Sequence, residues 1–153
     1  MTCLALFGHR NWIVVADSAY PAQSSPGIET IVSGASQLDT ARKVFKAIAA
    51  SKHVCAIVYL DRELEFLSEK DTPGVSQYRT QLAGLLKTAR KTTLPHERLI
   101  AKLDQTAQVF RVLVIKTNLA IPYTSIFFEL DCGYWNLGAE KRLRQAMSAQ
   151  GTN

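Results

Sequence analysis

The chain has 153 residues, of which 47% are hydrophobic and 20% are charged, and its formal net charge at pH 7 is +5. This length and composition predict one soluble globular domain that buries a core without disulfides or a structural metal. A membrane-spanning protein is excluded, because no apolar run approaches the roughly 18 residues that suggest a transmembrane helix. Residues 1–7 also lack the basic segment and the cleavage site of a signal peptide.

The first third of the chain predicts two strands joined by a long loop. Residues 12–16 form a short apolar run rich in β-branched side chains, which is typical of a buried strand. Residues 20–27 are rich in Pro and Ser and too long for a simple hairpin, as in loops that line a site. Residues 28–32 partly alternate apolar and polar side chains and predict a short strand.

A helix and a second buried strand follow, at residues 36–52 and 54–60. Either Ser36 or Asp39 caps the predicted helix start. The helix has one apolar stripe, formed by Leu38, Ala41, Val44, Phe45 and Ile48. Residues 61–65 contain paired carboxylates, but the density of charge from there to residue 71 favours a solvated surface.

The second half of the chain predicts helices that alternate with strands. Helices are expected at residues 75–89, after Pro73, and at 97–108, after Pro95. Strands are expected at residues 110–115 and 125–130, separated by a loop that contains Pro122. This alternation predicts an α/β fold of three layers, α/β/α, with helices covering a mostly parallel sheet.

Much of the excess positive charge lies in two clusters, Lys87/Arg90/Lys91 and Lys141/Arg142/Arg144. Both are typical of solvated helix surface, and neither is interleaved with the aromatic residues of a single-strand nucleic-acid binder. The second cluster lies in an amphipathic basic helix at residues 139–150, which is expected to fray into residues 151–153. We therefore expect a domain at residues 1–138 with a basic helical tail at 139–153, binding neither nucleic acid nor membrane.

The three cysteines, Cys3, Cys55 and Cys132, are odd in number, widely separated and without a Cys-x-x-Cys pair. This pattern argues against a disulfide framework or a zinc site and favours the reducing cytoplasm. Cys55 and Cys132 fall in strand-like segments, so they are expected to be inert thiols in the core.

The best candidate site residues from the pattern alone flank the first strand: His9 precedes it and Asp17 follows it. Ligands of open α/β sheets bind beyond the carboxyl ends of the strands. A histidine, with an ordinary pKa of about 6.5, holds or releases a proton near neutrality. The sequence therefore predicts that His9 and Asp17 meet at the rim of the sheet and move protons on a small polar substrate. The alternatives are a structural imidazole beside a turn and a carboxylate that braces the Pro-rich loop.

Two separated segments carry a family resemblance. Residues 7–24 read FGHRNWIVVADSAYPAQS, and residues 114–117 and 122–126 read VIKT and PYTSI. These resemble the Gly-His-x-Asp, strand, Asp-Ala-x-Phe/Leu-Pro signature and the Val-Ile-Arg-Thr-Gly-Glu, Pro-Tyr-x-Asn-Ile signature of the D-ribose pyranase/L-fucose mutarotase (RbsD/FucU) family. Between them, DTP at 71–73 and YRTQL at 78–82 are similar to the fucose mutarotase branch. The ordered set spans about residues 4 to 134.

The resemblance implies a cofactor-free isomerase. Members interconvert anomers, or pyranose and furanose rings, of a free monosaccharide such as fucose or ribose, and work as ring-shaped homo-oligomers with sites at subunit interfaces. This implies a mutarotase or pyranase that uses histidine general acid/base catalysis, with no metal. A second interpretation keeps the same fold and pocket without turnover, as a sugar-binding or regulatory protein.

By motif, His9 corresponds to the acid that protonates the ring oxygen, and Asp17 to the group that holds sugar hydroxyls. Tyr123 and Ser125 correspond to the sugar contacts of the adjoining segment. Ser125 stands where the family has Asn, so a two-headed amide contact becomes a single hydroxyl. Asn11 likewise replaces the Asp of the first signature.

Three further residues are assigned to substrate binding. The family has another His or Arg upstream of the Tyr-x-Asn motif, and here His96 and Arg98 both fall near that place. Tyr20 is expected to line or cover the pocket, because an aromatic face packs well on sugar C–H bonds. A core role for Tyr20 fits the pattern equally well.

Overall fold

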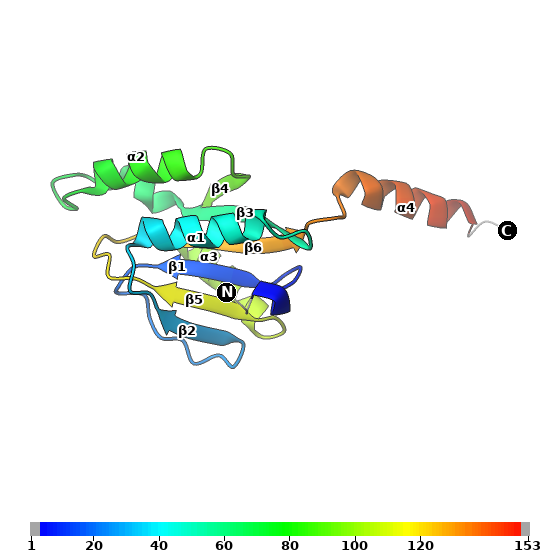
Figure 1. Cartoon of the computed structure of the whole chain (residues 1–153), viewed down its shortest axis with the longest axis horizontal. Helices are drawn as coiled ribbons and strands as arrows, with labels where there is room; N and C mark the ends of the chain where they lie inside the picture. The colour runs from blue at the N-terminus through cyan, green and yellow to red at the C-terminus, as the bar shows by residue number, and fades with distance from the viewer. Residues whose placement is uncertain (1–3, 151–153) are drawn as a thin grey trace.

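A computed structural model describes residues 4–150 and has a mixed six-stranded sheet at its centre (Figure 1). Its spatial order is β2-β5-β1-β6-β3-β4. Within the described chain, only β6 runs antiparallel to its neighbours, so the other strands end at the edge where β6 begins. This edge is called the carboxyl edge below, and the opposite one the amino edge. The strands are β1 (Trp12–Ala16), β2 (Ile28–Val32), β3 (Val54–Asp61), β4 (Lys91–Leu94), β5 (Val112–Lys116) and β6 (Ile126–Cys132).

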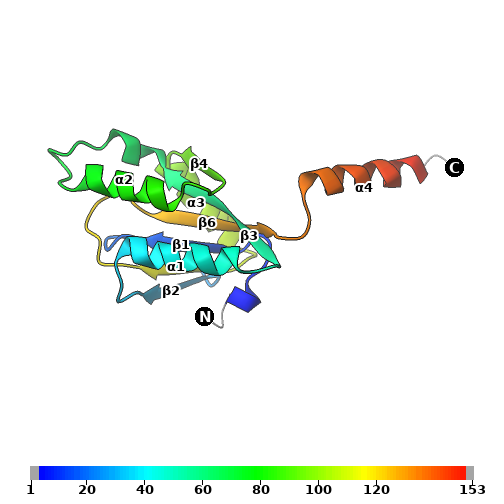
Figure 2. The same cartoon turned by 45° about the horizontal axis from the view of Figure 1, so that its top comes forward.

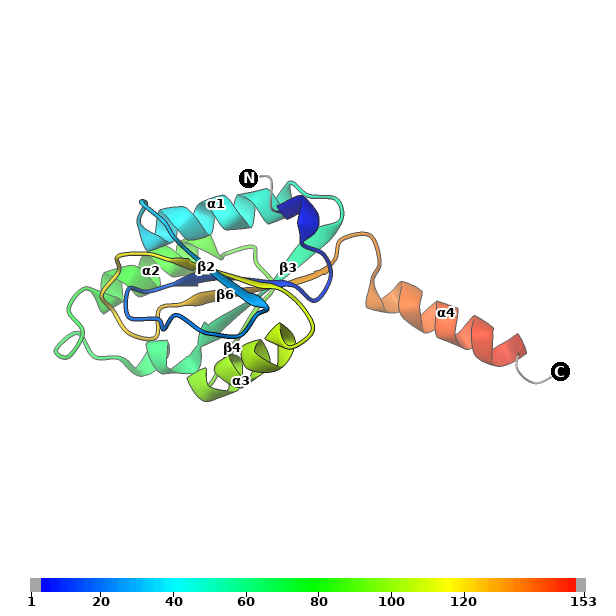
Figure 3. The ribbon, with the colours of Figure 1, turned by 90° about the horizontal axis from the view of Figure 1, so that it is seen from below.

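Helices cover both faces of the sheet and give the molecule three layers. Helices α1 (Gln37–Ala49) and α2 (Val75–Leu85) lie on one face, and α3 (His96–Ala107) lies on the other (Figure 3). Two short 3-10 helices, η1 (Leu4–Leu6) and η2 (Arg62–Phe66), complete the body. The predicted α/β fold with a mostly parallel sheet is confirmed.

The central strand β1 is buried at every position because both of its faces are covered. Ile13 and Val15 pack in the cluster beneath α1 and α2, while Trp12, Val14 and Ala16 pack in the cluster beneath α3. A strand with helices on both faces needs apolar side chains at successive positions, which explains the uninterrupted run in the sequence.

Helix α1 begins where its cap predicts. Ser36 is the N-cap, and its hydroxyl oxygen accepts a hydrogen bond from the backbone N–H of Asp39 at 3.2 Å. The helix ends at Ala49, three residues before the predicted end at Lys52, and the chain then turns into β3. The other predicted elements are present, with most ends shifted by a few residues.

The cap supports a stability prediction. Ser36→Ala removes the acceptor for a backbone N–H at the helix start, so the free energy of unfolding should fall by about 1 kcal/mol. Urea denaturation followed by circular dichroism measures the change. Ser24→Ala, an exposed serine in the Pro-rich loop, is the control and should leave the midpoint unchanged. Equal midpoints for the two variants would contradict the assigned role of the cap.

Strand β4 is the element that the sequence does not predict. Helix α2 ends at Leu85, not at residue 89, and residues 91–94 pair in parallel with the end of β3. These residues read KTTL, and only Leu94 is apolar, so no alternating pattern marks a strand. Pairing with β3 at the edge of the sheet decides the conformation here. The expected position of Arg90 and Lys91 on a helix surface is therefore wrong.

The prediction that Cys55 and Cys132 are core thiols is also wrong. Cys55 is exposed and Cys132 is half-buried, and both are free. Strand β4 pairs with residues 58–61 of β3, so among the described residues no strand pairs with the beginning of β3 on that side. Desolvation nevertheless raises the pKa of the Cys55 thiol, and the nearby Asp131 adds to the effect. Cys3 lies outside the described residues.

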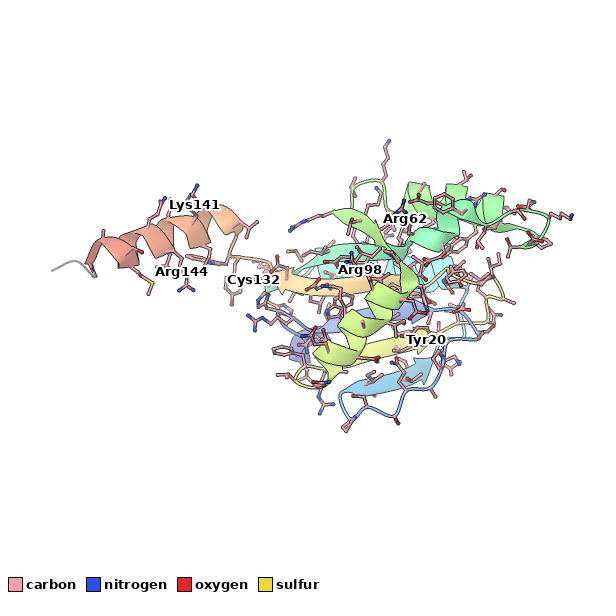
Figure 4. All side chains as sticks on the ribbon, turned by 180° about the vertical axis from the view of Figure 1, so that it is seen from behind. Tyr20, Arg62, Arg98, Cys132, Lys141 and Arg144 are labelled. Atoms are coloured by element: carbon pink, nitrogen blue, oxygen red, sulfur yellow. The ribbon has the colours of Figure 1, made fainter. Side chains whose placement is uncertain are left out.

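Helix α4 (Leu137–Gln150) projects from the body in every view (Figures 1, 2 and 3). None of its side chains is buried. Lys141 and Arg144 point away from the helix axis (Figure 4), as expected for a basic surface helix. The predicted fraying at 151–153 lies outside the described residues. Among residues 4–150, no helix is long and apolar enough to cross a membrane.

Candidate functional site

Polar side chains from neighbouring strands meet at the carboxyl edge of the sheet. Asp17 follows β1, Tyr123 and Ser125 precede β6, Asp61 ends β3, and His96 begins α3 directly after β4. Since β1, β6, β3 and β4 are consecutive in the sheet, these residues occupy adjacent positions along one edge. We call them the carboxyl-edge cluster. Ligands of α/β sheets bind at this place.

Two carboxylates hold His96, one through its imidazole and one through its backbone N–H. Its Nδ1 lies 3.0 Å from Oδ1 of Asp61, whose side chain is only 1% exposed. Glu63 accepts hydrogen bonds from the backbone N–H of His96, with both carboxylate oxygens 3.0 Å away. The ring of Tyr123 contacts the His96 ring edge-on, with centroids 5.5 Å apart. The position and orientation of this histidine are therefore fixed from several sides.

Burial perturbs both carboxylates of the cluster. Desolvation raises the pKa of Asp61 to about 6, with His96 opposing the shift and Glu63 and Asp17 adding to it. Desolvation also raises the pKa of Asp17, opposed by hydrogen bonds from its own and the Ala19 backbone and by Lys116. Perturbed carboxylates that gather at the rim of a sheet are typical of functional sites.

Ser125 is buried beside Asp17 and helps to oppose the rise in the pKa of that carboxyl. Ser125 stands where the family signature has Asn. Tyr123, two positions earlier, has φ +58° and is 39% exposed. A non-glycine residue in this left-handed region is strained, and such strain concentrates at functional sites.

A buried network fixes the loop between Tyr123 and Ser125. The Tyr78 hydroxyl donates to the backbone carbonyl of Thr124 at 2.8 Å, and the Gln37 amide donates to the same carbonyl. The Thr117 hydroxyl donates to Oε1 of Gln37 at 2.9 Å. Gln37 and Tyr78 come from α1 and α2, so the helical layer holds the site loop. The sequence pattern gives no signal for Gln37, and Tyr78 is visible only as part of the YRTQL motif at residues 78–82.

The charge pattern of residues 61–65 is misleading for Asp61 and Glu63. Their segment was expected to be solvated surface, yet Asp61 is buried and Glu63 caps α3. The available signal was positional: like Asp17, Asp61 directly follows a buried strand at the carboxyl edge. The charged residues that come after it obscured this similarity.

Two other residues were predicted to bind substrate; Tyr20 is buried, and Arg98 is exposed. Tyr20 packs in the cluster beneath α3, and its hydroxyl donates to Gln23, which in turn donates to Asp104. Arg98 lies on the exposed side of α3, two residues beyond His96 (Figure 4). The structure therefore brings His96, and not Arg98, into the carboxyl-edge cluster.

His9 lies at the amino edge, away from the cluster. Its Nδ1 is 3.1 Å from Oδ1 of Asp131 at the end of β6, and its side chain is 54% exposed. A surface hollow of about 1160 Å³ there is lined by His9, Cys55, Arg90, Asp131, Trp135 and other residues. Since five residues of β1 at about 3.3 Å each span roughly 16 Å, the prediction that His9 and Asp17 meet is wrong within one chain.

The chemistry available at the carboxyl edge is hydrogen bonding and proton transfer. Carboxylate oxygens, a tyrosine hydroxyl and an imidazole suit a ligand rich in hydroxyl groups. Among residues 4–150, no group of three His, Cys, Asp or Glu side chains is arranged to hold a metal ion.

Comparisons with known proteins relate the chain to one family and one fold. The model of the RbsD / FucU transport protein family matches residues 1–132. The structure of Bacillus subtilis RbsD complexed with D-ribose is similar, at 21% identity and a TM-score of 0.59, over 88% of this chain and 91% of that chain. The fucose mutarotase of Streptococcus pneumoniae in complex with L-fucose has 18% identity and a TM-score of 0.54, over 88% and 91%.

A third structure, FucU from Bifidobacterium longum, has 15% identity and a TM-score of 0.55, over 88% of this chain and 93% of that chain. At these identities the similarity shows a shared fold. A comparison with curated proteins found no match. The resemblance seen in the sequence motifs is confirmed.

Proposed function

Because the chain belongs to the RbsD / FucU transport protein family, we propose that it is a sugar mutarotase or pyranase. This isomerase interconverts anomers or ring forms of a free aldose that resembles fucose or ribose. The carboxyl-edge cluster carries the proposal: two carboxylates with raised pKa, a held imidazole and a strained tyrosine meet at the ligand-binding edge of the sheet. Two solved structures of the same fold are complexes with D-ribose and L-fucose.

The reaction suits a site equipped only for proton transfer. Opening a cyclic hemiacetal requires removal of the anomeric hydroxyl proton and protonation of the ring oxygen. The reaction already proceeds in water, so the 10²–10⁴-fold that a positioned acid or base supplies is sufficient. Asp17 accepts hydrogen bonds from sugar hydroxyls, and the partly exposed ring of Tyr123 packs beside the sugar.

His9 is the proposed acid, and it reaches the sugar from a neighbouring copy of the chain. One sugar can contact both His9 and Asp17 only where the amino edge of one copy meets the carboxyl edge of the next, since β1 separates the two residues. Such a head-to-tail contact joins different surfaces of the two copies and closes into a ring when the rotation permits. The proposal therefore includes a ring-shaped homo-oligomer with sites between subunits.

The domain boundary and the compartment complete the proposal. The mutarotase domain is residues 1–138, with 139–153 as a tail, because the family match ends at residue 132 and α4 buries no side chain. The free and partly exposed thiols of Cys55 and Cys132 favour a reducing cytoplasm.

The test measures the rate at which the anomers of L-fucose, D-ribose and a panel of other free aldoses interconvert. NMR magnetisation transfer between the anomeric proton signals gives this rate. We expect the chain to accelerate exchange above the buffer rate for at least one sugar. If none responds, the activity is excluded. Calorimetric binding without exchange would then support a sugar-binding protein, the alternative suggested by Ser125 in place of the family's Asn.

A further inference from the structure

The proposed function requires a base as well as an acid, and the structure offers a candidate at the carboxyl edge. Resting on that function, we infer that His96 is the base that takes the proton from the anomeric hydroxyl. We assign Asp61 as the positioning residue that holds His96 in the required tautomer. The proton-transfer groups are then two imidazoles, His9 from one copy and His96 from the next.

The hydrogen bond to Asp61 determines which nitrogen of His96 is reactive. A carboxylate only accepts hydrogen bonds, so the Asp61 contact at 3.0 Å places the imidazole proton on Nδ1. The lone pair then lies on Nε2, which forms no hydrogen bond to any of residues 4–150. The His96 side chain is 32% exposed, so part of this residue is open to a ligand. A buried carboxylate, an imidazole and a substrate hydroxyl in line form the arrangement of a general base with its orienting group.

Burying the Asp61 carboxylate at this position costs folding stability. Its Oδ2 is buried and, among the described residues, has no hydrogen-bond partner. Groups that face it are His96 from α3, Glu63 from η2 and Asp17 from the end of β1. Its pKa is raised to about 6, so the folded chain keeps this proton up to a higher pH than the unfolded chain does. Stability contributed by this residue therefore falls as pH rises from about 4 to 6, and the cost is complete above that range.

The residues around His96 place it beside the proposed sugar contacts. Tyr123, which carries the family motif, touches the His96 ring. Asp17, the proposed hydroxyl anchor, lies near enough to Asp61 to contribute to its raised pKa. In the proposed binding mode, sugar hydroxyls bind Asp17, the sugar ring lies against Tyr123, and the anomeric hydroxyl faces Nε2 of His96.

The ring-opening step balances in protons and electrons. Nε2 of His96 takes the O1 proton, the C1–O1 bond becomes a carbonyl, and the C1–O5 bond breaks with its electron pair moving to O5. The imidazolium of His9 protonates O5. Closure on the other face of the carbonyl reverses each transfer, so His96 returns its proton to O1 and His9 regains one from O5. The two histidines end in their starting states.

Two measurements test the assignment. At pH 8, nitrogen NMR of the imidazole should show the His96 proton on Nδ1 in the native chain and a shift toward Nε2 in Asp61→Asn. In the sugar assay, His96→Ala should lower kcat by about 10²-fold or more and Asp61→Asn by about 10-fold, each with a smaller change in KM. Asp61→Glu should recover part of the loss, because it restores a carboxylate.

The controls separate a catalytic defect from a folding defect. Glu97→Gln changes an exposed carboxylate one residue from His96 and should leave kcat unchanged. Asp61→Asn should be at least as resistant to urea as the native chain at pH 8, because it removes a buried charge. The assignment of His96 is wrong, while the proposed function stands, in either of two cases. One is a His96→Ala variant that accelerates anomeric exchange as much as the native chain does, and the other is a native chain that carries the His96 proton on Nε2. A native chain that accelerates no sugar overturns the proposed function and this assignment together.

Discussion

His9→Ala should lower kcat for anomeric exchange by about 10²–10⁴-fold, the contribution of one positioned proton-transfer group. The variant removes the proposed donor to the ring oxygen but leaves the hydroxyl anchor Asp17 in place, so KM should change much less than kcat. Because the His9 side chain is half-exposed and its polar partner is Asp131, the fold should tolerate the change. Anomeric exchange measured by NMR at several sugar concentrations separates the two constants.

The matched control for this variant is Arg111→Ala, another exposed residue at the amino edge. It should leave kcat unchanged, which would show that the edge itself tolerates truncation. Native kcat in His9→Ala would remove this histidine from the chemistry. The carboxyl edge would then hold the proton-transfer group on its own.

The layers of the fold could be predicted from the sequence because helix and strand patterns were strong. Residues 12–16 are all apolar, and the structure buries every one of them between two helical layers. Ser36 predicts a helix start that the structure also has. Strand β4 could not be predicted, because KTTL is extended only through its pairing with β3. That pairing joins distant parts of the chain and leaves no local pattern.

The site could be predicted in part, since single residues at strand ends are visible but their partners are not. The sequence marks Asp17 by its place directly after β1, whereas Asp61, the last residue of β3, is obscured by the charged residues that follow it. Between His96 and Arg98 the sequence could not choose. The helix geometry does so, because residues two apart on a helix face different directions. His96 lies against Asp61, and Arg98 is exposed.

The separation of His9 from Asp17 shows what one chain cannot reveal. The resemblance to the family implies one site for both residues, while the length of β1 places them at opposite edges of the sheet. The two statements agree only if the site is completed by a second copy, and the contact between copies is not encoded in any local pattern. The role of Tyr20 as a pocket residue stays a prediction.

Mixing two inactive variants should restore activity if the site is shared. His9→Ala lacks the acid, and Asp17→Asn loses a charged acceptor, which costs about 10–100-fold in kcat/KM. In rings assembled at random from equal amounts of both, about a quarter of the junctions pair an intact His9 with an intact Asp17. Activity per chain should therefore rise to about a quarter of the native value. Native mass spectrometry checks that the subunits have exchanged.

The converse mixture makes the result unambiguous. When native chains are mixed with the double variant His9→Ala/Asp17→Asn, a site built within one chain keeps half of the native activity however the subunits assemble. For a site built between chains, the activity falls from half of the native value toward about a quarter. Only junctions between two native copies then have both an intact His9 and an intact Asp17. Recovery in the first mixture and loss in the second together require contributions from two copies. Exchange of subunits with neither change would show that no site combines His9 of one copy with Asp17 of another, and the proposed shared site would be wrong.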